Sequence, residues 1–413
     1  MSGRVAFQYP NFRYFMMARF LATISSEMQA IAVGWQVYGL THRPLDLGLV
    51  GLAQFLPGVL LFLVSGQAAD RFPRRRIVMA CYAGFAGCSF ALLALTLSHN
   101  RQVWPIYAVL LGNGVVRSFN GAAGQSFLPS LIPAEHFPNA VAWSSSVFTG
   151  ATILGPAIGG LLYGLATTPA PVYASAAAGC LSSLLLASAI RVAVPPRKAA
   201  TMRMVFEGLH FIRRKQLVLG AISLDLFAVL LGGATALLPA YADSILKIGP
   251  SGLGMLRSGP AMGALLMATL NAYRPLRRRA GAAMLWCVAG FGVFTVVFGF
   301  SSSIPISMVS LILLGGCDMV SVIVRHTLVQ LSTPDEMRGR VSAVNMIFIG
   351  ASNELGQFES GLTAQWFGIV PAVVIGGIGT MAVVGAWAWL FPDLRKVDEL
   401  TTVGEKPSSP QRR

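Results

Sequence analysis

The sequence predicts an all-α membrane protein with twelve transmembrane helices in two pseudo-symmetric six-helix halves. Three observations indicate this class. The chain is strongly apolar: 54% of its 413 residues are hydrophobic and 11% are charged, whereas about a quarter of residues are charged in soluble domains. Its apolar residues form runs long enough to cross a bilayer, which takes about 20 residues. A pattern of apolar runs and basic loops also recurs at about half the chain length.

The expected spans follow one another with short loops between them. They cover residues 13–41, 45–70, 76–98, 103–129, 137–165, 170–194, 217–246, 251–273, 280–302, 304–331, 338–367 and 369–391. The predicted domains are an N-terminal bundle (1–194), a cytoplasmic linker (195–216), a C-terminal bundle (217–391) and a cytoplasmic tail (392–413). Apolar residues recur at helical spacing among the basic residues of the linker, which predicts an amphipathic helix lying on the inner leaflet.

Residue identities 203 positions apart carry the repeat. The matched pairs are Gly51 with Gly254, Pro57 with Pro260, Arg71 with Arg274, and Arg74, Arg75 and Arg76 with Arg277, Arg278 and Arg279. The acid is not repeated, because Asp70 falls on Tyr273. A shift of 201 similarly places Gly155 on Gly356 and Gly160 on Gly361. A basic loop alone could recur by chance, but the matching glycine and proline predict a duplicated helical bundle.

Basic residues are divided unevenly between the loops of the two sides. One side holds only Arg43, Arg101 and Lys247, and all the basic clusters fall on the other. Because Lys and Arg collect on the cytoplasmic side, both termini are predicted to be cytoplasmic in a multi-pass protein of the cell inner membrane. The net charge of +15 is then a property of loops, and no nucleic-acid partner is predicted.

Ionisable residues inside membrane helices are energetically costly and are therefore functional candidates. The proton-coupling candidates are Glu27, Glu354, Asp225 and Asp318; the first two are favoured because helix rise places them near mid-membrane. A carboxylate in a low-dielectric cavity can exchange a proton near neutral pH. The expected charge partners are Arg19, Arg117, Arg257 and Arg325. For each acid, structural pairing and substrate contact remain alternatives to proton coupling.

A short basic loop joins the second and third expected spans. Its spaced residues are Gly66, Asp70, Arg71, Arg74, Arg75 and Arg76. The spacing resembles the loop between the second and third helices of major facilitator superfamily transporters, with Pro73 where that family usually has glycine. The resemblance implies a cytoplasmic gating loop that latches the two halves. A plain topology anchor is the alternative.

A second motif lies in the fifth span and consists of Gly155, Pro156, Gly159 and Gly160. Its glycines would let neighbouring helices approach closely, and its proline would free a backbone carbonyl. The motif resembles one in the fifth helix of antiporters of this superfamily, which implies export, although Ala142 and Ala151 replace two glycines of the fuller pattern. Close packing without any bearing on transport direction is the alternative.

Longer runs resemble the branch of the superfamily that contains enterobactin exporters. They are WQVYGLT from Trp35, DLFAVLLGGATALLPAYA from Asp225, LRSGPAMGALL from Leu256, TPDEMRGRVSAVN from Thr333 and GASNELGQFESG from Gly350. The resemblance implies export of a small amphipathic organic molecule, such as a siderophore or drug, by proton-coupled antiport and alternating access. A monomer is expected, because nothing in the sequence demands a larger assembly. A lipid flippase, a metal exporter or a non-transporting sensor of the same fold are the alternatives.

Other functions are disfavoured by what the sequence lacks. It has no Gly-rich nucleotide loop and no His/Cys cluster with metal-ligand spacing, so an enzyme, a cofactor and a metal site are not predicted. Aromatic and amide residues inside the spans are candidates for lining a central cavity, although packing within the bundle is favoured for any single one. These residues are Trp35, Gln36, Gln54, Trp143, Asn345 and Asn353.

Overall fold

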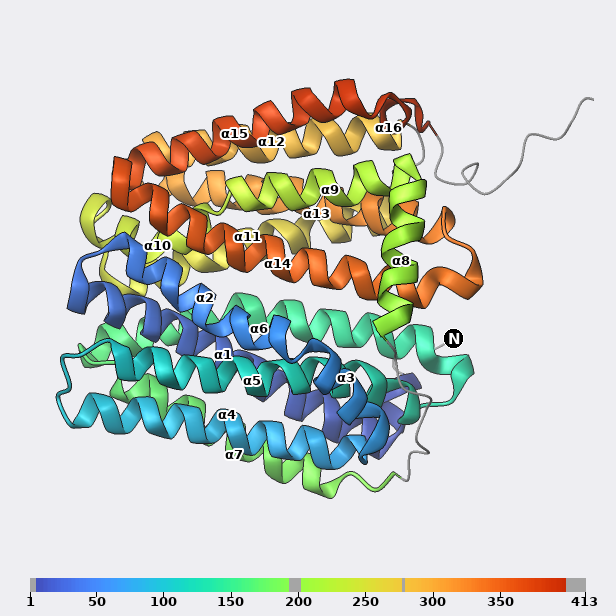
Figure 1. Cartoon of the computed structure of the whole chain (residues 1–413). Coiled ribbons are helices and arrows are strands. Elements are labelled where there is room, and N and C mark those ends of the chain that lie inside the picture. Colours follow the sequence, from blue (N-terminus) through green and yellow to red (C-terminus); the bar gives the residue numbers. More distant parts are fainter. Residues whose placement is uncertain (1–4, 193–201, 277–278, 399–413) are drawn as a thin grey trace, which may run out of the picture.

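The computed structural model describes residues 5–192, 202–276 and 279–398, which form a bundle of helices aligned along one direction (Figure 1). No β-strand occurs within these residues. The N-terminal half contains η1 (Val5–Gln8), α1 (Pro10–Thr41), α2 (Pro44–Leu60), α3 (Phe62–Arg71), α4 (Arg74–Leu97), α5 (Trp104–Phe127), η2 (Leu128–Ser130), η3 (Ala134–His136), α6 (Phe137–Ala166) and α7 (Ala170–Ala189).

The C-terminal half repeats this arrangement after a separate linker helix, α8 (Met202–Arg214). It contains α9 (Gln216–Leu231), η4 (Ala234–Leu237), α10 (Leu238–Ala240), the short π-helix η5 (Tyr241–Ile245), α11 (Gly249–Tyr273), α12 (Ala280–Phe300), α13 (Ile304–Leu331), α14 (Asp335–Phe367), α15 (Ile369–Leu390) and α16 (Pro392–Lys396). These segments make up the twelve expected spans in two six-helix halves.

Two of the expected spans are broken rather than continuous. The span expected over 45–70 consists of α2 and α3, which meet at Leu61. Pro57 lies inside α2 and has no N–H to donate to the preceding turn, which weakens the helix there. The span expected over 217–246 breaks at Gly232 and Gly233, where a Cβ on Gly233 would lie 2.6 Å from the carbonyl oxygen of Gly356. The first break thus follows a proline, and the second lies where α14 packs closely against the chain.

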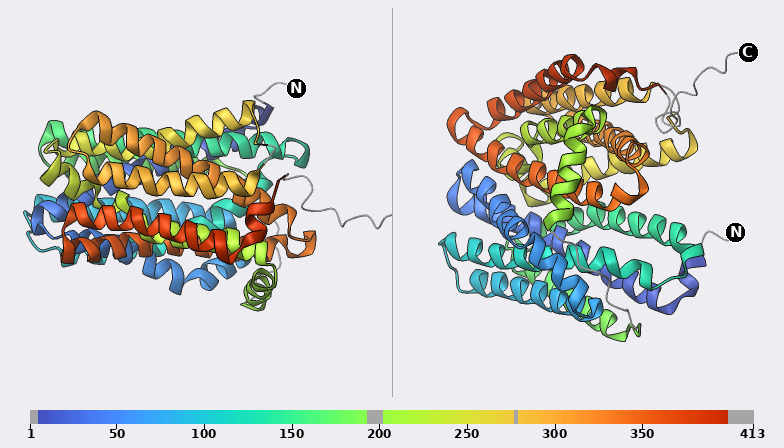
Figure 2. Two further views of the ribbon diagram at one scale, coloured as in Figure 1. Left: turned by 90° about the horizontal axis from the view of Figure 1, so that it is seen from above. Right: turned by 45° about the vertical axis from the view of Figure 1, so that its right-hand side comes forward.

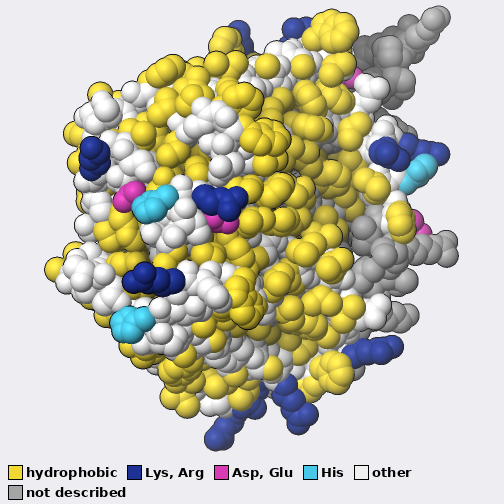
Figure 3. Space-filling model, turned by 60° about the vertical axis from the view of Figure 1, so that its left-hand side comes forward, with side chains coloured by type: hydrophobic (Ala, Val, Ile, Leu, Met, Phe, Trp, Pro, Cys, Tyr) yellow, Lys and Arg dark blue, Asp and Glu magenta, His cyan; other side chains and the backbone are white. Residues whose placement is uncertain are grey.

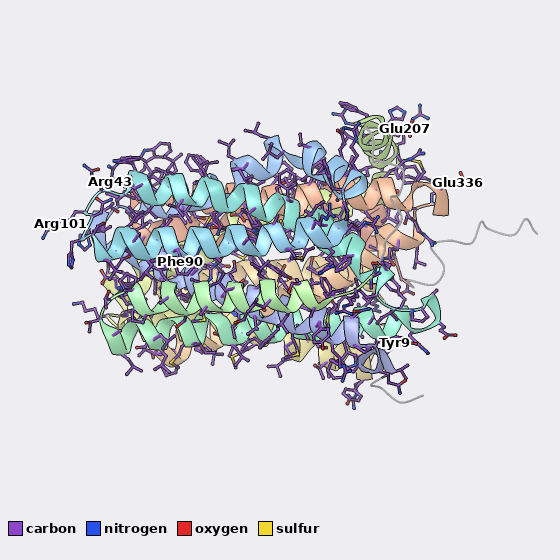
Figure 4. The ribbon with its side chains drawn as sticks, turned by 90° about the horizontal axis from the view of Figure 1, so that it is seen from below. Tyr9, Arg43, Phe90, Arg101, Glu207 and Glu336 are labelled. Atoms are coloured by element: carbon purple, nitrogen blue, oxygen red, sulfur yellow. The ribbon has the colours of Figure 1, made fainter. Side chains whose placement is uncertain are left out.

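The two ends of the bundle can be identified from labelled residues. Figure 4 places Arg43 and Arg101 at one end, and Tyr9, Glu207 and Glu336 at the other. We refer to these as the Arg43 end and the Glu336 end. The basic loop between α3 and α4 lies at the Glu336 end, since α2 begins at the Arg43 end.

The halves meet through two helix pairs, α6 with α11 and α2 with α14. The repeat relates these pairs, because α6 corresponds to α14 and α2 to α11. Glycines form the closest approach in both. A Cβ on Gly160 would lie 2.8 Å from the Cα of Gly254, and a Cβ on Gly361 would lie 2.9 Å from the Cα of Gly48. The duplication predicted from the sequence is thus present as two equivalent contacts near the Arg43 end.

Seven helical segments are long and apolar enough to cross a membrane by length and composition. They are Arg74–Leu97, Ala134–Ala166, Ala170–Ala189, Gln216–Ile245, Ala280–Phe300, Ile304–Leu331 and Ile369–Leu390. The other five spans are α1, α2 with α3, α5, α11 and α14, and each contacts the opposite half. Spans that face the other half can be less apolar, because protein rather than lipid surrounds part of their surface. On the face shown in Figure 3, hydrophobic side chains cover most of the surface and charged ones are sparse.

The linker helix α8 runs across the ends of the spans instead of along them (Figures 1 and 2). Its inward face is anchored by Ile212, which is 1% exposed and packs in one apolar cluster with Val341 and Val344 of α14. The first part of the expected linker, residues 195–201, lies outside the described residues.

Candidate functional site

An ion pair joins the two halves in the middle of the bundle. Nη1 of Arg117 in α5 lies 3.0 Å from Oε1 of Glu354 in α14. The other carboxylate oxygen of Glu354 accepts a hydrogen bond from Nε2 of Gln357 at 3.1 Å. The Glu354 side chain is 10% exposed and that of Arg117 is 59% exposed. The carboxylate is therefore enclosed, whereas the guanidinium faces an accessible space.

That space is an opening between the halves toward the Glu336 end. Gln357 packs against Gly51 of α2, where a Cβ would lie 2.9 Å from its Oε1. Met346, Gly350 and Asn353 precede Gln357 on the same face of α14, since they lie 11, 7 and 4 residues earlier. Met346 and Asn353 are exposed although they point toward the N-terminal half. The helices α2 and α14 thus separate beyond Gln357.

The second pair of helices, α6 and α11, separates in the same direction. Ser258 of α11 donates a hydrogen bond to the carbonyl oxygen of Ile153 in α6 at 2.7 Å. Met262, Leu265 and Thr269 continue the same face of α11 toward the Glu336 end, and all three are exposed. The bundle is therefore closed at the Arg43 end and open at the Glu336 end, with Arg117 and Glu354 at the base of the opening.

Glu27 lies beside this ion pair, on α1. A Cβ on Gly155 of α6 would lie 2.5 Å from the Cβ of Glu27, so the absence of a side chain at Gly155 makes room for the acid. The carboxylate is close enough to Arg257 and Arg117 for an electrostatic interaction with both guanidinium groups. Arg257 also donates a hydrogen bond to the carbonyl oxygen of Thr235 at 3.3 Å. Two acids and two arginines from both halves thus form one charge-balanced group.

The glycine motif of α6 packs against two helices, α1 and α11. Gly155 and Gly159 pack against Glu27 and Met28 of α1, whereas Gly160 packs against α11. Pro156, which lies within α6, offers a carbonyl oxygen 2.4 Å from where a Cβ on Gly254 would lie. The motif therefore connects the candidate site on α1 with the contact between the halves.

A second group of charges lies within the C-terminal half. Arg325 of α13 pairs with Asp225 of α9, and both side chains are buried. Nε of Arg325 has no hydrogen-bond partner in the described structure. Asp318 is partly buried and close enough to interact electrostatically with both members of the pair. His326 also lies close to Arg325.

The remaining predicted arginines hold helices of the N-terminal half together. Arg19 donates a hydrogen bond to the hydroxyl of Ser144 at 2.8 Å, and the described residues place no acid within ion-pair distance of it. Arg74 is buried and donates to the carbonyl oxygen of Ser126 at 2.7 Å, near the end of α5. Arg75 donates to the carbonyl oxygen of Ser188 near the end of α7. Arg74 and Arg75 therefore place positive charge at the carbonyl ends of α5 and α7.

The other residues of the basic loop differ in accessibility. Gly66 lies in α3 and has open space where a Cβ would be. Arg71 and Arg76 are exposed. The side chain of Asp70 lies outside the described structure, as do Arg277 and Arg278 of the second copy. A contact of this loop with the C-terminal half is thus not among the described interactions.

The six cavity candidates fall into different environments. Gln36 accepts a hydrogen bond from the hydroxyl of Tyr173 and is enclosed in the N-terminal half. Trp143 packs edge-to-face on Phe7, with ring centroids 4.8 Å apart. These two side chains therefore serve packing within the half.

The other four candidates lie nearer the contact between the halves. Trp35 packs against apolar clusters of both halves. The backbone of Gln54 packs against Gly114, where a Cβ would lie 2.5 Å from its carbonyl oxygen. Asn345 is buried, and its Oδ1 has no hydrogen-bond partner in the described structure. Only Asn353 is exposed on the face of α14 that borders the opening.

Gln357 and Ser258 belong to this region and are absent from the residues predicted from the sequence. Gln357 follows Glu354 by three residues, a spacing that places the two side chains on one helix face. That spacing could have identified Gln357 as a partner of Glu354 from the sequence. No sequence signal could have identified Ser258, because a serine in an apolar helix commonly donates a hydrogen bond to a backbone carbonyl of the same helix. The described residues contain no group of three or more His, Cys, Asp or Glu positioned to hold a metal ion.

Comparison with known proteins extends over nearly the whole chain. Residues 2–411 match a family described as transmembrane secretion effectors. The chain is 28% identical over 384 residues to proteins named enterobactin exporter EntS from Shigella boydii serotype 4 (strain Sb227) and Escherichia coli (strain SE11), with 90% of this chain and 86% of each relative covered.

Two solved structures show the same fold at low sequence identity. One is the nucleoside transporter NupG, with a TM-score of 0.71, 14% identity, and 92% of this chain and 99% of that chain covered. The other is a bacterial homologue of the human lysosomal transporter Spinster in an inward-facing, occupied conformation, with a TM-score of 0.72, 14% identity, and 97% and 99% covered. These two likenesses confirm the predicted fold, and the family match and the relatives named as exporters indicate a transporter rather than an enzyme. The protein belongs to the transmembrane secretion effector family of the major facilitator superfamily.

Proposed function

We propose that the protein is a secondary active exporter of the cell inner membrane that carries a small amphipathic organic molecule outward by alternating access. The observation that carries this proposal is the Arg117–Glu354 ion pair, which joins the halves at the base of the opening. Positive-inside topology would make the Glu336 end cytoplasmic and place both termini there, because the basic loops gather at that end. The opening would then receive substrate from the cytoplasm.

Proton coupling would act through the two central acids. In the conformation open at the Glu336 end, Glu354 forms its ion pair with Arg117 across the halves, and the protons carried by Glu354 and Glu27 would leave toward the cytoplasm. After the bundle reopens toward the Arg43 end, Glu354 and Glu27 would each take up a proton from outside while the substrate leaves. The neutral acids would allow the return step. This cycle is an antiport of protons against substrate.

The substrate class follows from the surroundings of the opening and from the relatives. Exposed Met262, Leu265 and Met346 offer apolar contacts, whereas Arg117 and Asn353 offer polar ones. An amphipathic molecule with phenolic or anionic groups suits this combination. Two relatives are named as enterobactin exporters, which supports a siderophore; a hydrophobic drug would suit the same groups. Nothing described requires more than a monomer.

The test is substrate-dependent proton movement in proteoliposomes, with a panel of siderophores and drugs applied to the wild type, Glu27→Gln and Glu354→Gln. Glu359→Gln is the matched control, because Glu359 lies on the same helix but its carboxylate accepts a hydrogen bond from Thr363 at 2.7 Å. We expect proton movement with one class of compound, lost in the first two variants and kept in the control. Substrate flux that ignores the proton gradient in every variant would exclude antiport and favour a facilitator or flippase.

A further inference from the structure

A cavity of 640 Å³ lies at α8 and the start of α14, away from the central charges. Its lining includes Phe206, Leu209, Arg213 and Arg214 of α8 and Met337 and Arg340 of α14. Figure 4 shows that Glu207 of α8 lies at the edge of the bundle, at the Glu336 end. The cavity therefore lies where the ends of the spans would meet the lipid headgroups.

Close packing fixes α8 against α14. A Cβ on Gly208 would lie 2.7 Å from the carbonyl oxygen of Arg340, so the two backbones touch at this glycine. Glu207 forms an ion pair with Arg340, with Oε2 and Nη1 2.6 Å apart. The apolar anchor at Ile212 lies on a different face of α8 from Phe206 and Arg213, since helical spacing separates it from them by roughly 100–120° around the axis. These contacts with α14 hold α8 in place, so the positions of the side chains on its outward face are fixed.

The charge of the cavity is positive. Glu207 offsets Arg340, but no described acid lies within ion-pair distance of Arg213 or Arg214, and both are exposed. Guanidinium groups bind phosphate oxygens with paired hydrogen bonds. A phosphate-bearing ligand would balance this excess charge better than a neutral one.

An apolar surface adjoins these arginines. Phe206 is 62% exposed. It lies on the same side of α8 as Leu209 and Arg213, which follow it by three and seven residues. A helix with aromatic and aliphatic residues beside arginines is typical of segments seated at the boundary between headgroups and acyl chains. The neighbouring apolar and cationic groups suit an amphiphilic anion.

We propose that this cavity binds the headgroup of an anionic phospholipid. Arg213 and Arg214 bind the phosphate oxygens, and Phe206 and Leu209 contact the beginning of the acyl chains. A soluble phosphate ester satisfies the arginines but leaves Phe206 exposed to water. The lipid occupies both kinds of surface on α8. This site is independent of the transport proposal.

Native mass spectrometry of the full-length protein tests the assignment by counting bound phosphatidylglycerol against phosphatidylcholine. We expect Arg213→Gln with Arg214→Gln to weaken phosphatidylglycerol retention about 30-fold, because each arginine near an anionic surface contributes about fivefold. The matched control removes two positive charges at the opposite end, Arg101→Gln with Lys247→Gln, and retains wild-type binding. Arg213→Lys with Arg214→Lys keeps the charge and retains most of the binding.

Three results would overturn the assignment. Wild-type retention in the Arg213 and Arg214 double variant would show that these arginines do not hold the lipid. An equal loss in the control variant would show a dependence on net charge alone. Displacement of phosphatidylglycerol by soluble glycerol phosphate at matched concentration would show a phosphate site without a lipid contribution. Phe206→Ser distinguishes a lipid site from a phosphate site. If acyl chains contact this ring, the variant binds the lipid more weakly and binds glycerol phosphate as the wild type does.

Discussion

Neutralising Glu354 should shift the protein away from the conformation described here. The relevant contact is the 3.0 Å ion pair with Arg117, which ties α14 to α5 across the two halves. At an effective dielectric constant of about 20, two unit charges at that separation attract by about 5 kcal/mol. The 59% exposure of Arg117 screens this attraction, and exposed pairs contribute at most about 1 kcal/mol. Since Glu354 is enclosed, about 1–2 kcal/mol is a reasonable net contribution for the pair.

That free energy corresponds to a change of about 5- to 30-fold in the ratio of the two conformations. Glu354→Gln removes the charge and keeps the shape, so the population open at the Arg43 end should rise by this factor. Spin labels at Arg101 and Lys247, one on each half at that end, would report the separation by electron–electron distance measurements. The five native cysteines must be replaced first.

Glu359→Gln again provides the control, because it removes one acid from the same helix without touching an ion pair. The reasoning fails if Glu354→Gln leaves the distance distribution unchanged, or if Glu359→Gln produces the same shift. A double variant with Arg117→Gln adds a further check. If the two residues act through their contact, the combined effect must be smaller than the sum of the single effects.

Three further outcomes are expected. Asp225→Asn should lower thermal stability markedly, by about 3–5 kcal/mol, because it leaves Arg325 buried without its partner; a second change of Arg325→Met should recover much of the loss in thermal melts. Gly160→Ala should disturb the contact between the halves and raise accessibility at the Arg43 end, whereas Gly150→Ala, with nothing within 4 Å, should not, as cysteine labelling would show. Tyr241→Phe should destabilise the protein by about 1–2 kcal/mol in chemical denaturation, because its buried hydroxyl donates to backbone carbonyl oxygens at the end of α12 and just after it.

The repeat is the part of the fold that could be predicted furthest from the sequence. Gly160 and Gly361, which match at a shift of 201, both lie at contacts between the halves: Gly160 packs against Gly254, and Gly361 packs against Gly48, three residues before the repeat partner of Gly254. Glycines at helix contacts leave a direct trace in the sequence, because no other residue permits that approach. The predicted twelve spans and two halves are also confirmed. They could be predicted because the length of an apolar run and the spacing of glycines can be read directly from the sequence.

Pairing between distant side chains could not be predicted. Glu27 and Glu354 have similar depth, and several arginines could have balanced either one, so depth alone does not show that Arg117 contacts Glu354. The direction of a side chain around its helix axis decides this, and a partner 237 residues away fixes it. Gln36 illustrates the same limit, because its hydrogen bond with Tyr173 encloses it within one half. Helix breaks such as that at Leu61 also escape a prediction based on apolar length.

The central ion pair also has a consequence for how the chain is made. Arg117 is synthesised 237 residues before Glu354, an interval of roughly 10–50 s at about 5–20 residues per second. During that time the newly inserted first half presents a cation and the flat glycine surface of α6 to the bilayer, with neither partner yet available. We expect nascent chains to depend on the insertion machinery or a membrane chaperone until α11 and α14 emerge. Separately expressed halves should then be degraded alone and stabilised when produced together.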